Sequence, residues 1–288
     1  MSAAASVEEW SGKDRGDENF PVGSFLVAAR LRPAVHAFYA FARNADDIAD
    51  SATLAPEDKI ARLDMMEAVL TGTRSDGSPS AAALRASLAV TGTTDRHARD
   101  LLVAFRRDAI KKRYESWDEL LDYCGYSAMP VGRHVLDLHG ESRDTWPASD
   151  ALCSVLQVLN HLQDATKDLA SLDRCYLPLD ILSVNHATVE DLRRDAATPG
   201  MRATIDALLD RCDTLMAGPP LPTLVRDRRL RLETATIHGL ARRLARRLRR
   251  GDPIAGRVAL QRRDVAASLL AAFSHVRDPQ ISASGAAA

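Results

Sequence analysis

Hydrophobic residues recur at helical spacing along nearly the whole chain. Apolar side chains stand three or four positions apart in long segments, most of which lack interior proline, as in amphipathic helices. Runs that alternate apolar and polar residues, which are typical of strands, are missing. The sequence therefore predicts an all-α protein, with helices over residues 24–31, 33–51, 56–71, 80–91, 95–112, 116–139, 148–169, 188–216, 223–249 and 263–275.

Turn-forming residues separate these helices without dividing the chain into domains. The segments "TWPASD" (145–150) and "GPPLP" (218–222) are two such breaks. The 288 residues are 46% hydrophobic, which is enough for one sizeable core. We expect a single domain over residues 18–277, a flexible N-terminus over 1–17 and a disordered tail over 278–288.

Composition and charge exclude several classes of protein. The formal net charge is −1, so the chain has no general attraction for nucleic acid. Its four cysteines show no CxxC spacing, which is typical of reduced structural thiols in a cytosolic protein. The N-terminus lacks the pattern of a secretory signal, and no apolar run approaches the ~20 residues that span a bilayer. We expect a cytoplasmic protein with no nucleic-acid partner.

Two pairs of aspartates stand at helical spacing in otherwise apolar helices. Asp46 and Asp50 follow the aromatic residues of "FYAFARNADDIADS" (38–51), and Asp164 and Asp168 lie in "SVLQVLNHLQDATKDLA". Because four residues turn a helix by about 400°, each pair occupies one helix face. Two carboxylates on one face repel each other unless a cation lies between them.

Hard carboxylate oxygens are the ligands that Mg²⁺ prefers, usually one or two of them together with substrate phosphate. Two facing pairs could therefore hold Mg²⁺ ions that bind and neutralise a diphosphate leaving group. A single such pair is more often part of a solvated face, but two pairs within apolar helices favour the metal interpretation. A di-iron bundle would require Glu-x-x-His, which the sequence lacks.

These motifs resemble, in order, those of the squalene/phytoene synthase family, whose members join two prenyl chains head to head. "YAFARNADDIAD" is similar to the family's first aspartate-rich motif, and "LQVLNHLQDATKDL" with "DRCYLP" to its second. "LLDYCGYSAMPVG" resembles the tyrosine-bearing helix between them, and "DPIAGRVAL" the C-terminal arginine segment. The resemblance covers roughly residues 19–275 and implies an isoprenoid-synthase-type helical bundle around a central apolar cavity.

The resemblance also assigns roles to individual residues. Asp46, Asp50, Asp164 and Asp168 match the catalytic Mg²⁺-diphosphate ligands. The resemblance implies that eight further residues bind substrate, either at the diphosphate or along the cavity: Phe20, Tyr39, Arg43, Tyr123, Gln157, Asn160, Tyr176 and Arg257. For Arg43 the alternative is a salt bridge to a neighbouring aspartate, and for the aromatic residues it is core packing. The amides of Gln157 and Asn160 must find hydrogen-bond partners if they are buried.

Within the family, "ENFPVGSFL" (18–26) and "NHLQD" (160–164) resemble the bacterial branch that forms hydroxysqualene. Other members usually carry arginine where Gln163 stands, and glycine where Asp173 stands. This branch is a Mg²⁺-dependent carbon–oxygen lyase that converts presqualene diphosphate and water into hydroxysqualene and diphosphate. Two alternatives stay open. One is a transferase that condenses two allylic diphosphates such as farnesyl diphosphate, and the other is a non-catalytic relative that acts as an assembly protein.

A basic segment near the C-terminus, residues 226–250, carries leucines at four-residue steps with arginines between them. We interpret it first as a bundle helix with a solvated cationic face. The alternative is docking on an anionic membrane surface at the inner face of the membrane. No aromatic platform accompanies the arginines, so nucleic-acid binding fits poorly. Contact with neighbouring enzymes of the squalene pathway stays open.

Overall fold

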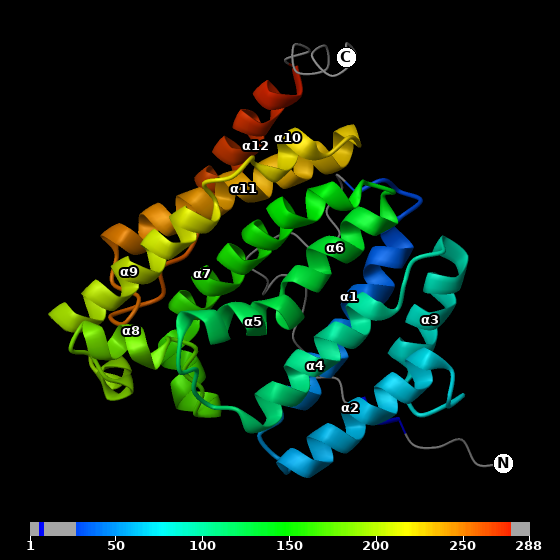
Figure 1. The fold of residues 1–288 in the computed structure, drawn as a ribbon, viewed down its shortest axis with the longest axis horizontal. Helices are drawn as coiled ribbons and strands as arrows, with labels where there is room; N and C mark the ends of the chain where they lie inside the picture. The colour runs from blue at the N-terminus through cyan, green and yellow to red at the C-terminus, as the bar shows by residue number, and fades with distance from the viewer. Residues whose placement is uncertain (1–5, 9–26, 278–288) are drawn as a thin grey trace.

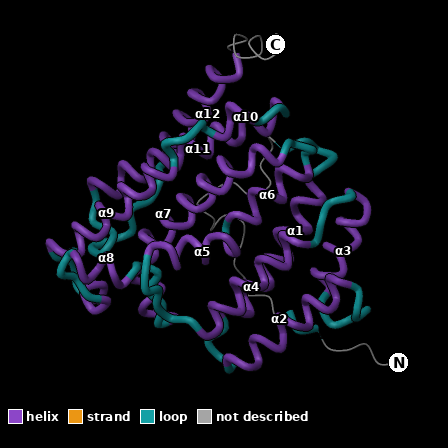
Figure 2. The backbone as a smooth tube through the Cα atoms, viewed as in Figure 1, coloured by secondary structure: helices purple, strands orange, loops and turns teal. Residues whose placement is uncertain are grey.

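The computed structural model describes residues 6–8 and 27–277, and this part of the chain is helical with no strand (Figures 1 and 2). The all-α prediction is confirmed. The helices are α1 (Arg32–Asp50), α2 (Pro56–Thr71), α3 (Pro79–Thr91), α4 (Arg96–Ile110), α5 (Trp117–Ser127), α6 (Met129–Leu138), α7 (Trp146–Leu172), α8 (Leu179–Val184), α9 (Pro199–Leu215), α10 (Leu221–Leu224), α11 (Arg228–Arg250) and α12 (Arg262–Arg277), with short 3-10 turns η2 (Arg143–Thr145) and η3 (Val189–Arg193).

Three expected helices are wrong in their boundaries. The segment 116–139 breaks at Ala128 into α5 and α6, because Pro130 has no amide hydrogen and is tolerated only in the first turn of a helix. The segment 188–216 begins as η3, and α9 starts only at Pro199. The segment 223–249 is likewise divided between α10 and α11. Proline at the start of α6 and α9 is a signal that periodicity alone overlooks, whereas α11 begins after the capping residue Asp227.

Two further differences concern short segments. The expected helix 24–31 is a turn where it is described, from residue 27 onward, and the Leu31 amide donates to the Ala28 carbonyl at 2.8 Å. The six-residue helix α8 was not expected at all. Both are too short for a hydrophobic period to be established.

Two hydrophobic clusters form the interior. The first lies among α1 to α4 and includes Phe41, Leu63 and Leu101, all nearly inaccessible to solvent. The second surrounds α7, the 27-residue helix that contacts α5, α6, α9 and α11. Figure 1 shows α7 crossing the middle of the molecule, with α9, α11 and α12 on one side and α5 and α6 on the other. The helix with the second aspartate pair is therefore central to the fold.

A short described piece of the N-terminal segment lies against α3. The carboxylate of Glu8 accepts hydrogen bonds from the hydroxyl and amide of Ser80, at 2.7 and 3.0 Å, and from the hydroxyl of Ser78. The Val7 amide donates to the Gly77 carbonyl at 2.9 Å. A carboxylate at this position complements the exposed amides and positive dipole of the α3 N-terminus.

Candidate active site

The two aspartate pairs lie on different helices, near enough to interact electrostatically. Asp46 and Asp50 lie one turn apart at the C-terminal end of α1, and Asp164 and Asp168 lie one turn apart on α7. Burial raises the pKa of Asp168 to about 7, and the negative charges of Asp164 and Asp50 add to this increase. Since Asp50 belongs to the other helix, this repulsion indicates that the pairs approach one another.

Asp46 lies near the end of α1, beside Arg43. Burial raises its pKa to about 8, with a further contribution from the charge of Asp50 and an opposing one from Arg43. Its side chain still exposes 37% of its surface, so the carboxylate is crowded by protein atoms without being sealed in the core. A cluster of carboxylates that repel one another is stabilised by any cation that enters it.

Two arginines already bind the acidic cluster on its α1 side. Arg174 is 3% exposed, and its guanidinium lies 2.6 Å from Asp50 and donates to the Ala49 carbonyl at 3.0 Å. Arg43 contacts Asp47 at 3.0 Å and, on the same helix, Asp46 at 3.3 Å. The salt bridge considered for Arg43 is therefore present, and it places a cation beside the first aspartate pair.

The residue before Asp164 connects α7 to the C-terminal arginine segment. Gln163 is 3% exposed, and its amide donates to the Val258 carbonyl at 2.6 Å. The neighbouring Arg257 lies with its Nε 3.8 Å from a carboxylate oxygen of Asp164. The glutamine that replaces the family's usual arginine thus holds the loop that brings Arg257 to the second aspartate pair.

Asp108 on α4 lies in the same cluster, although it is not among the residues predicted from the sequence. Its buried carboxylate accepts hydrogen bonds from the hydroxyls of Tyr123 at 2.7 Å and Tyr176 at 3.0 Å. Burial raises its pKa to about 6, while Arg174 and the two hydroxyls act in the opposite direction. A signal was available, because Asp108 stands four residues after the buried Ala104 and so belongs to the apolar face of α4.

Two of the tyrosines predicted to bind substrate, Tyr123 and Tyr176, form an aromatic cluster around this carboxylate. Tyr176 stacks on His161, with ring centroids 3.7 Å apart, and both rings pack near Tyr123. Gln157 contacts His161 at 3.2 Å, one turn along α7. Burial lowers the pKa of His161 to about 3, so its imidazole is neutral at physiological pH.

An apolar cavity of about 360 Å³ lies beside the aspartate pairs. Tyr39 lines it from α1, one turn before Arg43, as predicted for a cavity aromatic residue. Phe38 and His134 also line it, with their rings stacked at 3.9 Å. On α7 the cavity ends at Leu156, two turns before Asp164. On both helices, the aspartates are therefore C-terminal to the residues that line the cavity.

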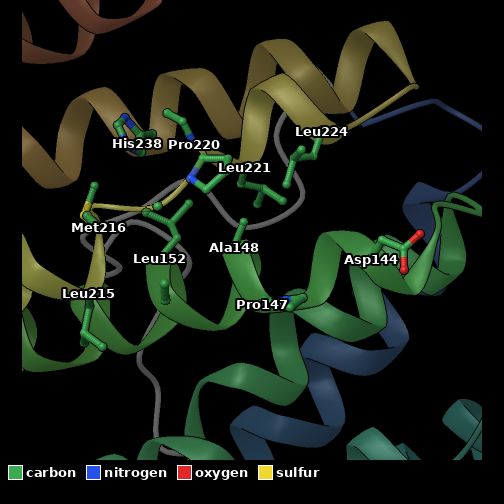
Figure 3. Close-up of a pocket in the computed structure, with 13 residues that line it drawn as sticks. Asp144, Pro147, Ala148, Leu152, Leu215, Met216, Pro220, Leu221, Leu224 and His238 are labelled. Atoms are coloured by element: carbon green, nitrogen blue, oxygen red, sulfur yellow. The ribbon is translucent and has the colours of Figure 1, made fainter. Parts of the chain in front are cut away.

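A second pocket of about 250 Å³ shares Leu152 and Leu221 with this cavity. Figure 3 shows these two side chains with Met216 and His238 around the loop between α9 and α10. Two buried leucine side chains are thus common to the walls of the two spaces.

The remaining predicted substrate-binding residues are Asn160 and Phe20. Asn160 is half-buried on α7, one turn before Asp164, whereas Phe20 lies outside the described residues. Asp173, where relatives usually have glycine, ends α7 with a φ of 52°. This left-handed conformation favours glycine, which explains the family's preference. Here the Asp173 carboxylate instead pairs with Arg113 at 2.7 Å.

Among the residues that the structure describes, no three acidic, histidine or cysteine side chains lie close enough together to enclose one metal ion. The donor chemistry nevertheless fits Mg²⁺. This ion takes one or two carboxylates and completes its shell with water and phosphate oxygens, and each helix presents one carboxylate pair. The mutual repulsion that raises the pKa values of Asp46 and Asp168 is relieved by a divalent cation.

A helical bundle with paired acids near an apolar cavity is typical of enzymes that act on prenyl diphosphates. The family model for squalene/phytoene synthases matches residues 13–264. A hydroxysqualene synthase from Rhodopseudomonas palustris is 48% identical over 262 residues, which cover 91% of this chain and 89% of that protein. The chain belongs to the squalene/phytoene synthase family, whose members act on prenyl diphosphates and typically use a divalent metal.

Solved structures agree with this assignment. The squalene synthase HpnC from Alicyclobacillus acidocaldarius is 35% identical, with a TM-score of 0.71 over 82% of this chain and 90% of that one. A dehydrosqualene synthase in complex with ligand shares the fold at 21% identity, with a TM-score of 0.76 over 90% and 92%. The predicted isoprenoid-synthase-type fold is therefore confirmed. No helix in the described part of the chain is long and apolar enough to cross a membrane.

Proposed function

We propose that this chain is a Mg²⁺-dependent hydroxysqualene synthase that converts presqualene diphosphate and water into hydroxysqualene and diphosphate. The observation that carries the proposal is the electrostatic interaction between the aspartate pairs of α1 and α7, two helices that also line an apolar cavity. The 48% identity to the Rhodopseudomonas palustris enzyme supports the choice of reaction within the family.

In this proposal, Asp46, Asp50, Asp164 and Asp168 hold the metal ions. Bound Mg²⁺ supplies positive charge to the diphosphate oxygens. Arg43 and Arg257 lie beside the first and second aspartate pairs, at 3.3 and 3.8 Å. Both guanidiniums are therefore placed to donate to the diphosphate, Arg43 from α1 and Arg257 from the loop between α11 and α12.

The reaction begins with heterolysis of the carbon–oxygen bond, and the electron pair leaves with the diphosphate. The resulting cyclopropylcarbinyl cation rearranges inside the cavity, where the π face of Tyr39 stabilises positive charge. Water then forms the new carbon–oxygen bond and loses a proton, which the diphosphate can accept. The apolar wall excludes other water and so limits capture at the wrong carbon.

The aromatic cluster around Asp108 positions the second aspartate motif. Tyr176 follows Arg174 by two residues, and its hydroxyl is held by Asp108 on α4. Arg174 in turn binds Asp50 on α1. The segment that follows α7 is thus joined to α1 and α4 at the metal-binding end of the cavity. We propose that Tyr123, Gln157, Asn160 and Tyr176 shape this end of the substrate site.

The squalene synthase HpnC, at 35% identity, makes squalene formation the second candidate. The test incubates purified protein with presqualene diphosphate and Mg²⁺, without NADPH, in ¹⁸O-labelled water. Mass spectrometry of the extracted lipids should find ¹⁸O-labelled hydroxysqualene. Parallel reactions contain farnesyl diphosphate, with and without NADPH. Formation of presqualene diphosphate or squalene from farnesyl diphosphate would refute the proposal.

Two variants control this experiment. Asp46→Asn with Asp164→Asn removes one carboxylate from each pair and should abolish product formation, while Asp213→Asn alters an exposed aspartate on α9 and should leave it intact. Product formation by the double variant would exclude the aspartate pairs as the metal site. A wild-type protein inactive with every prenyl diphosphate would favour the non-catalytic assembly role.

A further inference from the structure

The last helix, α12, packs on α11 through one face only. Asp264, Ser268 and Ala272 stand four positions apart on this face and are 7%, 1% and 1% exposed. The approach is close, because a Cβ atom at Gly239 of α11 would lie 3.2 Å from the Cβ of Ser268. Figure 1 shows α12 at the outer edge of the molecule, with α11 between it and the rest of the bundle.

The opposite face of α12 is apolar and exposed to solvent. Leu270 and Phe273 lie on this face and are 72% and 45% exposed, Val265 is 45% exposed at the edge of the buried face, and no charged residue occurs from Val265 to Phe273. In the described part of the chain, these three are among only eight large hydrophobic residues with such exposure. The outward face of a surface helix is normally charged or polar, so this face indicates a partner.

A basic cleft of about 450 Å³ lies at the start of this helix. It contains one carboxylate, that of Asp264, which pairs with Arg247 at 2.7 Å. By contrast, Arg249 on the other side of α11 is neutralised by Asp210 and Asp213 of α9. The cleft therefore has a clear excess of positive charge, and its arginines are Arg243, Arg246, Arg247, Arg250 and Arg263.

We propose that this surface, formed by the basic cleft and the apolar face of α12, docks the enzyme on an anionic phospholipid bilayer. An apolar helix face bordered by arginines matches the two layers of a membrane surface, with lipid phosphates outside and acyl chains beneath them. A second copy of the chain is a poorer match, because a two-fold interface would bring another set of the same arginines to the contact.

The docking surface lies close to the apolar cavity. One face of α11 carries α12, and another contributes Leu230, Thr234 and Ile237 to the cavity wall. Two packed helices, α11 and α12, each about 10 Å in diameter, thus separate the bilayer surface from the space for an apolar substrate. This arrangement suits any long prenyl substrate that partitions into membranes, so the inference does not rest on the particular reaction proposed above.

The test is co-sedimentation of the full chain with phosphatidylcholine vesicles, with or without phosphatidylglycerol, in the absence of substrate. The wild-type protein should bind only the anionic vesicles, and added salt should weaken the binding. Arg246→Gln with Arg250→Gln should lower the partition coefficient roughly 25-fold, since each arginine near an anionic surface contributes about fivefold. Leu270→Glu with Phe273→Glu should lower it roughly a hundredfold.

The matched control is Val90→Glu, which adds a negative charge at an 88% exposed valine at the end of α3. Circular dichroism and thermal unfolding verify that each variant is folded. Absence of binding to anionic vesicles, or an equal loss in Val90→Glu, would overturn the proposal. A wild-type dimer that Leu270→Glu with Phe273→Glu converts to monomer would assign the face to self-association and would also overturn it.

Discussion

Replacing Asp168 by asparagine should stabilise the metal-free protein while it removes a proposed metal ligand. In the folded protein the pKa of Asp168 is raised from its ordinary value of 3.8 to about 7. A group with a raised pKa contributes stability below its unfolded pKa and loses that contribution as pH rises through its folded pKa. At pH 8 the wild-type protein therefore carries an ionised carboxylate in an unfavourable place, and Asp168→Asn does not.

The size of the effect follows from the shift of about 3 pKa units. At 1.36 kcal/mol per unit this corresponds to about 4 kcal/mol. Because the side chain is half-buried and partly screened by solvent, we expect about 2 kcal/mol. For a chain of this size, that free energy raises the midpoint of thermal unfolding by about 4 °C.

The assay is urea denaturation in EDTA between about pH 4 and pH 8. The free energy of unfolding of Asp168→Asn minus that of the wild type should grow with pH and level off above pH 7. Taking this difference cancels the titration of all other groups. Adding Mg²⁺ should then stabilise the wild type more than the variant. A difference that stays constant with pH, or a variant less stable at pH 8, would refute the reasoning. Asp213→Asn, a 70% exposed surface aspartate, should show little change.

Three further predictions concern the surroundings of the site. Arg174→Met removes the buried partner of Asp50 and should lower the free energy of unfolding in EDTA by about 3 kcal/mol; an unchanged urea midpoint would contradict this. Gln163→Leu releases the loop that carries Arg257 and should raise KM about fivefold, whereas a change in kcat alone would argue against a positioning role. Burial lowers the pKa of His134 to about 4. The stability that its neutral form contributes is therefore fully present above the unfolded pKa of 6.5 and is lost as pH falls. In His134→Phe, the decrease in the free energy of unfolding on acidification should be about 3 kcal/mol smaller than in the wild type. Identical acid unfolding curves for variant and wild type would count against this.

The fold class and the aspartate pairs could be predicted from sequence because both depend on local spacing. A helix repeats every 3.6 residues, so Asp46 with Asp50, and Asp164 with Asp168, had to share a face. The breaks at Ala128 and before Pro199 were missed because hydrophobic period is insensitive to a single missing amide hydrogen. Proline position is the better guide at those points.

The partners of the site residues could not be predicted in the same way. Asp108 accepts hydrogen bonds from tyrosines 15 and 68 positions away, and the local sequence of α4 does not identify these partners. The role of Gln163 depends on a loop carbonyl 95 positions further along the chain. Such contacts are set by how helices pack, which a single sequence does not encode in any periodic signal.

The ion pair between Arg174 and Asp50 joins residues 124 positions apart in the chain. Closing a loop of this length has a large entropic cost that only the contacts formed afterwards can offset. The two halves of the proposed diphosphate site can therefore come together only after α7 and the segment that follows it have been synthesised. A nascent chain released before this point would contain the first aspartate motif and the cluster formed by α1 to α4, yet it could not assemble the binding site. Metal binding would then show that the contacts between distant segments have formed, and not merely that the helices have formed.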